Sequence, residues 1–152
     1  MSIETQFVKL KKQLTPDRMM LLSGKERQEV SLLLGSLEAS IRREKAADSF
    51  LEFSAGVWPA FIEGAHHRSM AKAFERVATG DLKRLMINMP PRMGKSQLTS
   101  WLLPAWIMGR SPDKKIIMAS HTAELAVRFG RMVRNLIGSE EYLQLFPDVS
   151  LT

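Results

Sequence analysis

A segment that ends in Gly94-Lys95-Ser96 carries the residues best suited to chemistry in this sequence. Glycine lets the backbone approach a phosphate closely, a lysine ammonium pairs with phosphate charge, and a serine hydroxyl is an oxygen ligand for Mg²⁺. A helical pattern follows at once, and the N–H groups at the start of a helix bind anions. The pattern therefore predicts a phosphate-binding loop for ATP and Mg²⁺, in which Lys95 reaches the β- and γ-phosphates and Ser96 completes the metal's ligands.

The loop departs from the strict phosphate-loop pattern at its first position. That pattern requires glycine at the first of its eight positions, and Met89 stands there instead. A short Gly-Lys-Ser sequence also occurs by chance in ordinary chains. From the residues alone, a phosphate-binding loop is favoured, and a plain surface turn remains the alternative.

The elements around the loop alternate between strand and helix patterns. Short apolar runs at 85–88 and 116–119 predict strands, and each is followed by a helical stretch, the first extending to Met108. Pro104 is expected to kink that helix or end it early. Strand–helix–strand–helix at this spacing predicts a βαβ unit with a parallel sheet, hence an α/β fold of the P-loop NTPase class. Apolar residues on one face of the second helix are Leu125, Phe129, Met132, Val133 and Leu136.

The first half of the chain is predicted to be helical. Ile3, Phe7, Leu10 and Leu14 are spaced as one face of a helix, and Ser23 with Glu26 forms a capping-box pattern before a helix at 25–47. A short helix and a packed loop are expected over 48–64, and a further helix ends at Thr79-Gly80. We therefore expect an N-terminal helical region at 1–47 and an incomplete P-loop ATPase domain at 48–152.

The loop resembles the deviant Walker A motif of the large subunit of tailed-phage terminases, the motors that package DNA into procapsids. Pro90-Pro91-Arg92-Met93-Gly94-Lys95-Ser96 has the Pro-Pro-Arg-x-Gly-Lys-Ser form of that family, in which the first glycine is commonly absent. Supporting similarity lies in Trp58-Pro59, in 64–68, in 78–84 and in 118–122 with the Arg-bearing helix that follows. The resemblance covers about residues 50–147.

That resemblance implies roles for individual residues. Arg92 would contact the nucleotide's phosphates and couple hydrolysis to movement, and Lys95 and Arg92 together would act in catalysis by stabilising charge on the transferring phosphoryl group. The aromatic segment 53–67 would border the adenine. The nucleotide-binding residues that it implies are Pro91, Arg92, Met93, Gly94, Lys95, Ser96 and Gln97.

The same resemblance implies partners and a location. The chain would be the N-terminal portion of a motor that acts on double-stranded DNA, assembles as a homo-oligomer, and meets a small terminase subunit and a portal ring in the host cytoplasm. Hydrolysis also needs an acidic residue after an apolar strand, the Walker B element. No such run follows Ser96, since Pro147 interrupts the candidate 145–148. We therefore expect this chain, without Walker B or the family's nuclease domain, to be inactive in hydrolysis alone.

Charge and composition favour an anionic partner. Lysine and arginine outnumber aspartate and glutamate by 22 to 16, which gives a net charge of +6. The sequence has no cysteine, which excludes disulfides and thiolate metal sites, and its apolar runs are too short to span a membrane. The alternative function is thus a non-enzymatic, basic helical protein that binds nucleic acid or a protein partner, with an incidental Gly-Lys-Ser.

Three further sets of residues have both a functional and a structural interpretation. Arg128, Arg131 and Arg134 share one side of a helix, where they could meet DNA phosphates or a neighbour's ATP, although such rows are usually solvent-exposed faces. Trp58 and Phe61 are more often core residues than base contacts. His66 and His67 lack the carboxylate or cysteine partner that a metal site would need.

Overall fold

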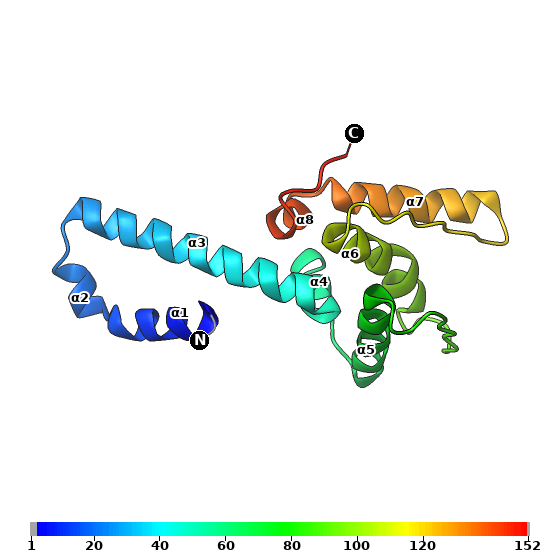
Figure 1. The fold of residues 1–152 in the computed structure, drawn as a ribbon, viewed down its shortest axis with the longest axis horizontal. Helices are drawn as coiled ribbons and strands as arrows, with labels where there is room; N and C mark the ends of the chain where they lie inside the picture. The colour runs from blue at the N-terminus through cyan, green and yellow to red at the C-terminus, as the bar shows by residue number, and fades with distance from the viewer. Residues whose placement is uncertain (1–2, 152) are drawn as a thin grey trace. The chain divides into compact units, whose positions relative to one another are not determined.

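Helices supply all the regular secondary structure in residues 3–151, the part of the chain that the computed structural model describes (Figure 1). Of these residues, the side chains of Ile3 and Pro16 are not described. The chain divides into two units, Met1–Glu44 and Lys45–Thr152. The boundary falls inside a long helix, α3 (Gly24–Asp48). No helix among the described residues has both the length and the apolar character needed to cross a bilayer.

The first unit contains α1 (Ile3–Gln13), α2 (Pro16–Met20) and most of α3. The predicted capping box is confirmed: the Ser23 N–H donates to Glu26 Oε2 at 2.8 Å, and the Glu26 N–H donates to Ser23 Oγ at 3.4 Å. Lys11 of α1 pairs with Glu38 of α3 at 2.7 Å. No described side chain of this unit is buried, so the unit has no hydrophobic core of its own among the described residues.

The second unit holds the hydrophobic core. Its elements before the loop are α4 (Phe50–Val57) and α5 (Ala65–Thr79), and those after it are η1 (Gln97–Leu102), α6 (Leu103–Arg110), α7 (Ala123–Ile137) and α8 (Glu140–Leu145). Fully buried rings lie edge to face at its centre, with ring centroids 5.0 Å apart for Phe50 and Phe74 and 5.5 Å apart for Phe50 and Trp106.

Two buried hydrogen bonds fix the core to the backbone. The Trp106 indole N–H donates to the Ala46 carbonyl at 2.7 Å, and the Tyr142 hydroxyl donates to the Ala105 carbonyl at 2.9 Å. Burial raises the pKa of the Tyr142 phenol above its usual range. The core therefore satisfies the polar ends of its large aromatic side chains.

The α/β fold predicted from the sequence is wrong for the described residues. Both expected strands, 85–88 and 116–119, are coil, and no described residue belongs to a strand. Exposure alternates along 116–119, where Ile117 is 94% exposed and Met118 packs partly against the core. In 85–88, Leu85 and Met86 are both exposed and Ile87 packs partly against the core. Each apolar run therefore packs partly against the core, but a strand also needs a neighbouring strand to satisfy its backbone, and among the described residues neither run has one.

Several helix boundaries agree with the sequence. The helix predicted to end at Thr79-Gly80 does so, with Gly80 in the left-handed conformation at φ 88°. The helix predicted from the apolar face containing Leu125 and Leu136 is α7, which begins after Thr122, whose side chain accepts from the Leu125 N–H.

Pro104 changes the type of helix without ending it. Residues 97–102 form a π-helical segment in which the Leu103 N–H donates to the Leu98 carbonyl, and an α-helix continues from Leu103 to Arg110. Pro104 lies in the first turn of that α-helix, where its missing N–H is tolerated. The α-helix therefore starts just before the proline, after a π-helical turn, and it continues two residues beyond the expected Met108.

Candidate phosphate-binding site

The loop before Lys95 is turned. Residues 91–94 form a turn and a bend, and both Arg92 (φ 66°) and Gly94 (φ 76°) have left-handed backbone conformations. Gly94 accepts this geometry without penalty, whereas Arg92 is the only described residue other than glycine with positive φ. Such strain in a side-chain-bearing residue is concentrated at functional sites in proteins, at a cost of about 1–3 kcal/mol.

A helix begins immediately after this turn. The Leu98 N–H donates to the Gly94 carbonyl at 3.0 Å, which closes the first helical turn over Lys95 and Ser96. The Thr99 hydroxyl donates to the Lys95 carbonyl at 2.7 Å, a hydrogen bond that stabilises the next turn. The first N–H groups of a helix have no acceptor within it, so this end of the helix carries partial positive charge. Lysine at its first position adds a full charge.

A cavity of about 290 Å³ lies beside the loop. One wall comes from the segment between α4 and α5, including Trp58 and Phe61, whose ring centroids are 5.6 Å apart. The opposite wall comes from the loop and the helix that follows. The residues lining the cavity are Trp58, Phe61, Ile62, His66, His67, Arg92, Met93, Gly94, Gln97 and Leu98. The site therefore combines flat aromatic surfaces with a cationic, turned backbone.

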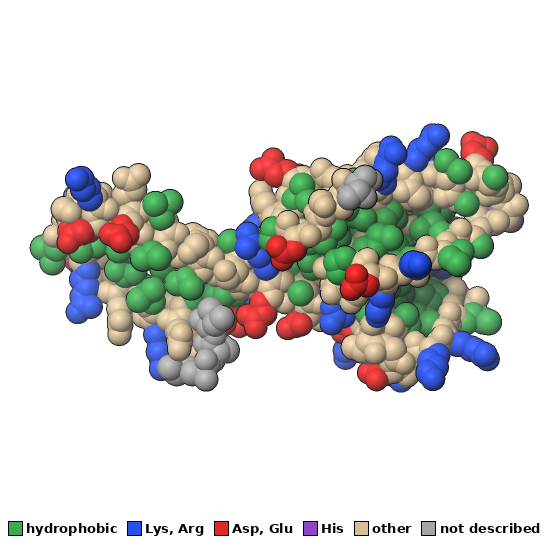
Figure 2. Space-filling view, turned by 45° about the horizontal axis from the view of Figure 1, so that its top comes forward, with side chains coloured by type: hydrophobic (Ala, Val, Ile, Leu, Met, Phe, Trp, Pro, Cys, Tyr) green, Lys and Arg blue, Asp and Glu red, His purple; other side chains and the backbone are tan. Residues whose placement is uncertain are grey.

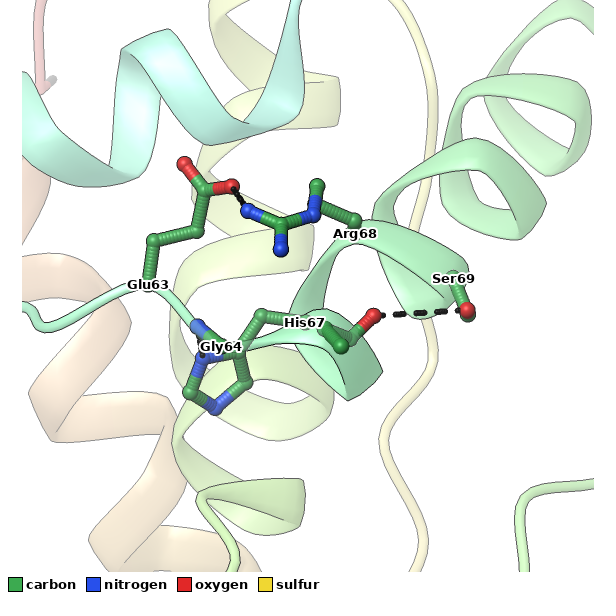
Figure 3. A network of polar contacts seen from close by, with 6 residues as sticks. Glu63, Gly64, His67, Arg68 and Ser69 are labelled. Carbon is green, nitrogen blue, oxygen red and sulfur yellow. Dashed lines mark hydrogen bonds and ion pairs between the residues drawn. The ribbon is translucent and has the colours of Figure 1, made fainter.

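His67 joins the two walls of the cavity. Its Nδ1 accepts from the Gly64 N–H at 3.0 Å, a capping contact at the start of α5, and Glu63 pairs with Arg68 on the same turn (Figure 3). Its Nε2 lies 3.3 Å from the place a Cβ would occupy on Gly94. Burial and the neighbouring His66 lower the pKa of His67, and backbone hydrogen bonds with Met93 and Ile62 partly oppose that change.

The structure brings together part of the predicted set. Arg92, Met93, Gly94 and Gln97 line the cavity, together with Trp58, Phe61 and both histidines. Pro91, Lys95 and Ser96 do not line it; Pro91 and Ser96 are exposed and Lys95 is half-buried at the helix start. Trp58 and Phe61 pack against the core, as the structural interpretation expects, and they also line the cavity.

Sequence reasoning missed one apolar lining residue and the contact made by another residue. Leu98 belongs to no motif, although it lies on the buried face of its helix, whereas Ile62 lies within the expected segment 53–67. The capping contact of His67 had a weak signal in the Gly-x-x-His spacing, where the third residue of a helix reaches back to the residue before it. The contact between His67 and the loop depends on tertiary packing and has no local signal.

No described group of three or more histidine, cysteine, aspartate or glutamate side chains is arranged to hold a metal ion. His66 and His67 lie with ring centroids 3.8 Å apart. The Nε2 atom of His66 is buried, and none of the described residues supplies it with a hydrogen-bond partner. Metal binding in the proposed site would therefore depend on Ser96 together with phosphate oxygens of the ligand.

The arginine row is confirmed as an exposed face. Arg128, Arg131 and Arg134 are all exposed on α7, opposite the residues that α7 buries, Val133, Leu136 and Ile137. Figure 2 shows lysine and arginine side chains scattered over the face in view, with apolar side chains between them.

Comparison of the chain with models of known protein families, with curated proteins and with solved structures finds no match.

Proposed function

We propose that this chain is the ATP-binding N-terminal portion of a DNA-packaging motor of the terminase large-subunit kind. The observation that carries the proposal is the turned segment 91–94, which enters a helix at Lys95 beside a cavity with aromatic walls. It is supported by the Pro-Pro-Arg-x-Gly-Lys-Ser sequence of that segment. The proposal concerns the loop and its ligand, and it needs no sheet among the described residues.

The chemistry of the loop fits a nucleoside triphosphate. Lys95 and Arg92 supply two cations for the phosphates, and the first N–H groups of the helix supply neutral donors. Ser96 is exposed at the helix start, where its hydroxyl suits a Mg²⁺ ion that the phosphates also bind. The base would then occupy the cavity between Trp58 and Gln97, because an aromatic wall favours a flat heterocycle.

The activity proposed for this chain is binding. Hydrolysis needs an acidic residue that positions water or holds the metal from the opposite side, and the sequence after Ser96 offers none at the end of an apolar run. In the proposed motor, the double-stranded DNA, further copies of the chain, the small subunit and the portal ring are partners, and the host cytoplasm is the location. The net charge of +6 is compatible with DNA as the polymer that the motor moves.

The alternative is a basic helical protein that binds nucleic acid or a protein partner and has an incidental Gly-Lys-Ser. The specific observation in its favour is the exposed row of Arg128, Arg131 and Arg134 on α7. Such a protein would bind DNA through phosphate contacts, with an affinity that falls steeply as salt is raised. This alternative function gives no reason for the positive φ of Arg92.

A titration with Mg-ATP separates the two functions. Trp58 lines the cavity, so nucleotide binding should change tryptophan fluorescence, and Lys95→Ala should weaken that binding at least about tenfold because a charged hydrogen bond is lost. Lys72→Ala, at an exposed position of α5, is the matched control and should bind as the parent does. Equal ATP affinity in Lys95→Ala and the parent would remove the role assigned to the loop. Salt-sensitive DNA binding without any ATP binding would support the alternative.

A further inference from the structure

His67 connects two parts of the site that are far apart in the sequence. On one side, Nδ1 accepts a hydrogen bond from the Gly64 backbone at the start of α5. On the other side, Nε2 lies 3.3 Å from the place that a Cβ would occupy on Gly94, and the Met93 backbone is near enough to affect the pKa of the ring. The imidazole therefore lies between a helix end and the turned loop, in contact with both.

The contact with Gly64 determines the state of the ring. Because Nδ1 accepts, the neutral ring carries its proton on Nε2, the atom that faces the loop. A doubly protonated ring has no acceptor, so the Gly64 N–H would lose its partner. Only the neutral form can cap α5 and contact the loop together.

The surroundings of the ring favour this neutral form. Burial lowers the pKa of His67, and the neighbouring His66 ring, whose centroid lies 3.8 Å from that of His67, lowers it further. Glu63 attracts a positive charge on His67, but it is already paired with Arg68. The Phe61 ring, with its centroid 5.1 Å from that of His67, covers another side of the imidazole.

We propose that His67 is the positioning residue of the phosphate loop: its neutral ring bridges the start of α5 to Met93 and Gly94 and holds residues 92–94 in their turned conformation. This inference rests on the proposed function only for its consequence, which is that triphosphate affinity depends on His67. The ordering of the loop itself needs no nucleotide. His67 does not contact the phosphates in this scheme, so its effect passes through the loop backbone.

The variants His67→Gln and His67→Ala separate loop positioning from helix capping. Glutamine is a favoured residue at the third helical position, because its side chain reaches back to the N–H before the helix, so His67→Gln keeps the cap and loses the ring. His67→Ala loses both. His121→Gln, at an exposed position outside the site, is the matched control.

Backbone hydrogen exchange without nucleotide is the first measurement. In His67→Gln, the amides of Arg92, Met93 and Gly94 should exchange about tenfold faster or more, because they open locally, while α5 keeps its protection. In His67→Ala both regions should exchange faster. Loop exchange in His67→Gln equal to that of the parent, or faster exchange confined to the start of α5, would overturn the proposal.

The pH dependence of the same exchange is the second measurement. After correction for the chemical exchange rate, the parent's loop should lose protection as pH falls below 6.5, the ordinary pKa of the His67 side chain, and His67→Gln should lack that loss. His66 is unchanged in both proteins, so the comparison isolates the effect of His67. Identical pH profiles for the two proteins would contradict the role of the ring.

A nucleotide titration distinguishes failure of this inference from failure of the proposed function. Weaker Mg-ATP binding by His67→Gln than by the parent and by His121→Gln supports both. A parent that binds no ATP, but whose loop becomes mobile in His67→Gln, refutes the proposed function and leaves the positioning role intact. A parent that binds ATP as tightly as His67→Gln does refutes the positioning role alone.

Discussion

Replacing Gly94 by alanine tests the turned loop most sharply. An L side chain enters the left-handed region at a cost of roughly 1–2 kcal/mol, and Gly94 has φ 76°. The new Cβ would also lie 3.1 Å from Leu98 Cδ1 and 3.3 Å from His67 Nε2, closer than ordinary contact. We expect a loss of about 2 kcal/mol in unfolding free energy, which lowers the thermal midpoint by about 4–8 °C in a chain of this size.

Two other glycines supply the controls for this change. Gly80 has φ 88° with nothing within 4 Å of an added Cβ, so Gly80→Ala imposes the backbone strain alone. Gly130 lies in α7 with nothing within 4 Å, and alanine there should stabilise the protein by up to about 1 kcal/mol. Thermal unfolding followed by circular dichroism should therefore order the variants with Gly130→Ala highest, Gly80→Ala below the parent, and Gly94→Ala lowest.

Nucleotide affinity then separates strain at the site from strain elsewhere. If the turned loop is the binding conformation, Gly94→Ala should weaken Mg-ATP binding about 5- to 30-fold, which is the equivalent of roughly 1–2 kcal/mol. Gly80→Ala should leave it unchanged despite its own loss of stability. ATP affinity that is equal in Gly94→Ala and the parent, or equally reduced in both alanine variants at positive φ, would refute the reasoning.

Two further predictions follow from the backbone and the core. Arg92→Gly should raise the unfolding free energy by about 1 kcal/mol, because glycine removes the strain at φ 66°, yet weaken ATP binding at least about tenfold, because a cation is lost; a variant that is more stable and binds ATP normally would show that Arg92 does not contact the ligand. Tyr142 is the single tyrosine, so alkaline titration of its ultraviolet absorbance reports this residue alone. Because burial raises the pKa of the folded state, stability is lost as pH rises past the ordinary value of 10.0, and ionisation should coincide with unfolding. Ionisation near pH 10.0 in a folded protein would contradict the burial of this side chain.

The helices could be predicted because their signals are local. The Ser23 and Glu26 side chains lie close enough in sequence to cap α3 without help from the rest of the chain. The apolar face of α7 likewise repeats with the helical period, so the residues it buries follow from spacing alone. The short helix α8 was not predicted, although Ser139 caps it, because it is too short to establish a period.

The strands could not be predicted correctly because a sheet depends on partners distant in sequence. Residues 116–119 have the apolar character of a strand, and their alternating exposure is also typical of one. What the sequence pattern cannot report is whether another extended segment lies alongside. Here Ile87 and Met118 pack partly against the helical core. Their segments have no neighbouring strand among the described residues, so they form coil.

Only the local features of the candidate site could be predicted from the sequence. The motif located the loop and its glycine, and Gly94 has the positive φ that glycine permits. The positive φ of Arg92 has no signal in its residue type, since arginine rarely adopts it. The approach of His67 to Gly94 joins positions on separate elements, and only the folded chain reveals it.

Hydrogen exchange with and without Mg-ATP tests the central claim most directly. The account predicts that saturating Mg-ATP slows exchange of the amides from Arg92 to Gln97, with a smaller effect around Trp58 and His67 and none on α7. ATP-dependent protection elsewhere in the chain, or exchange in 92–97 that is the same with and without the nucleotide, would contradict it.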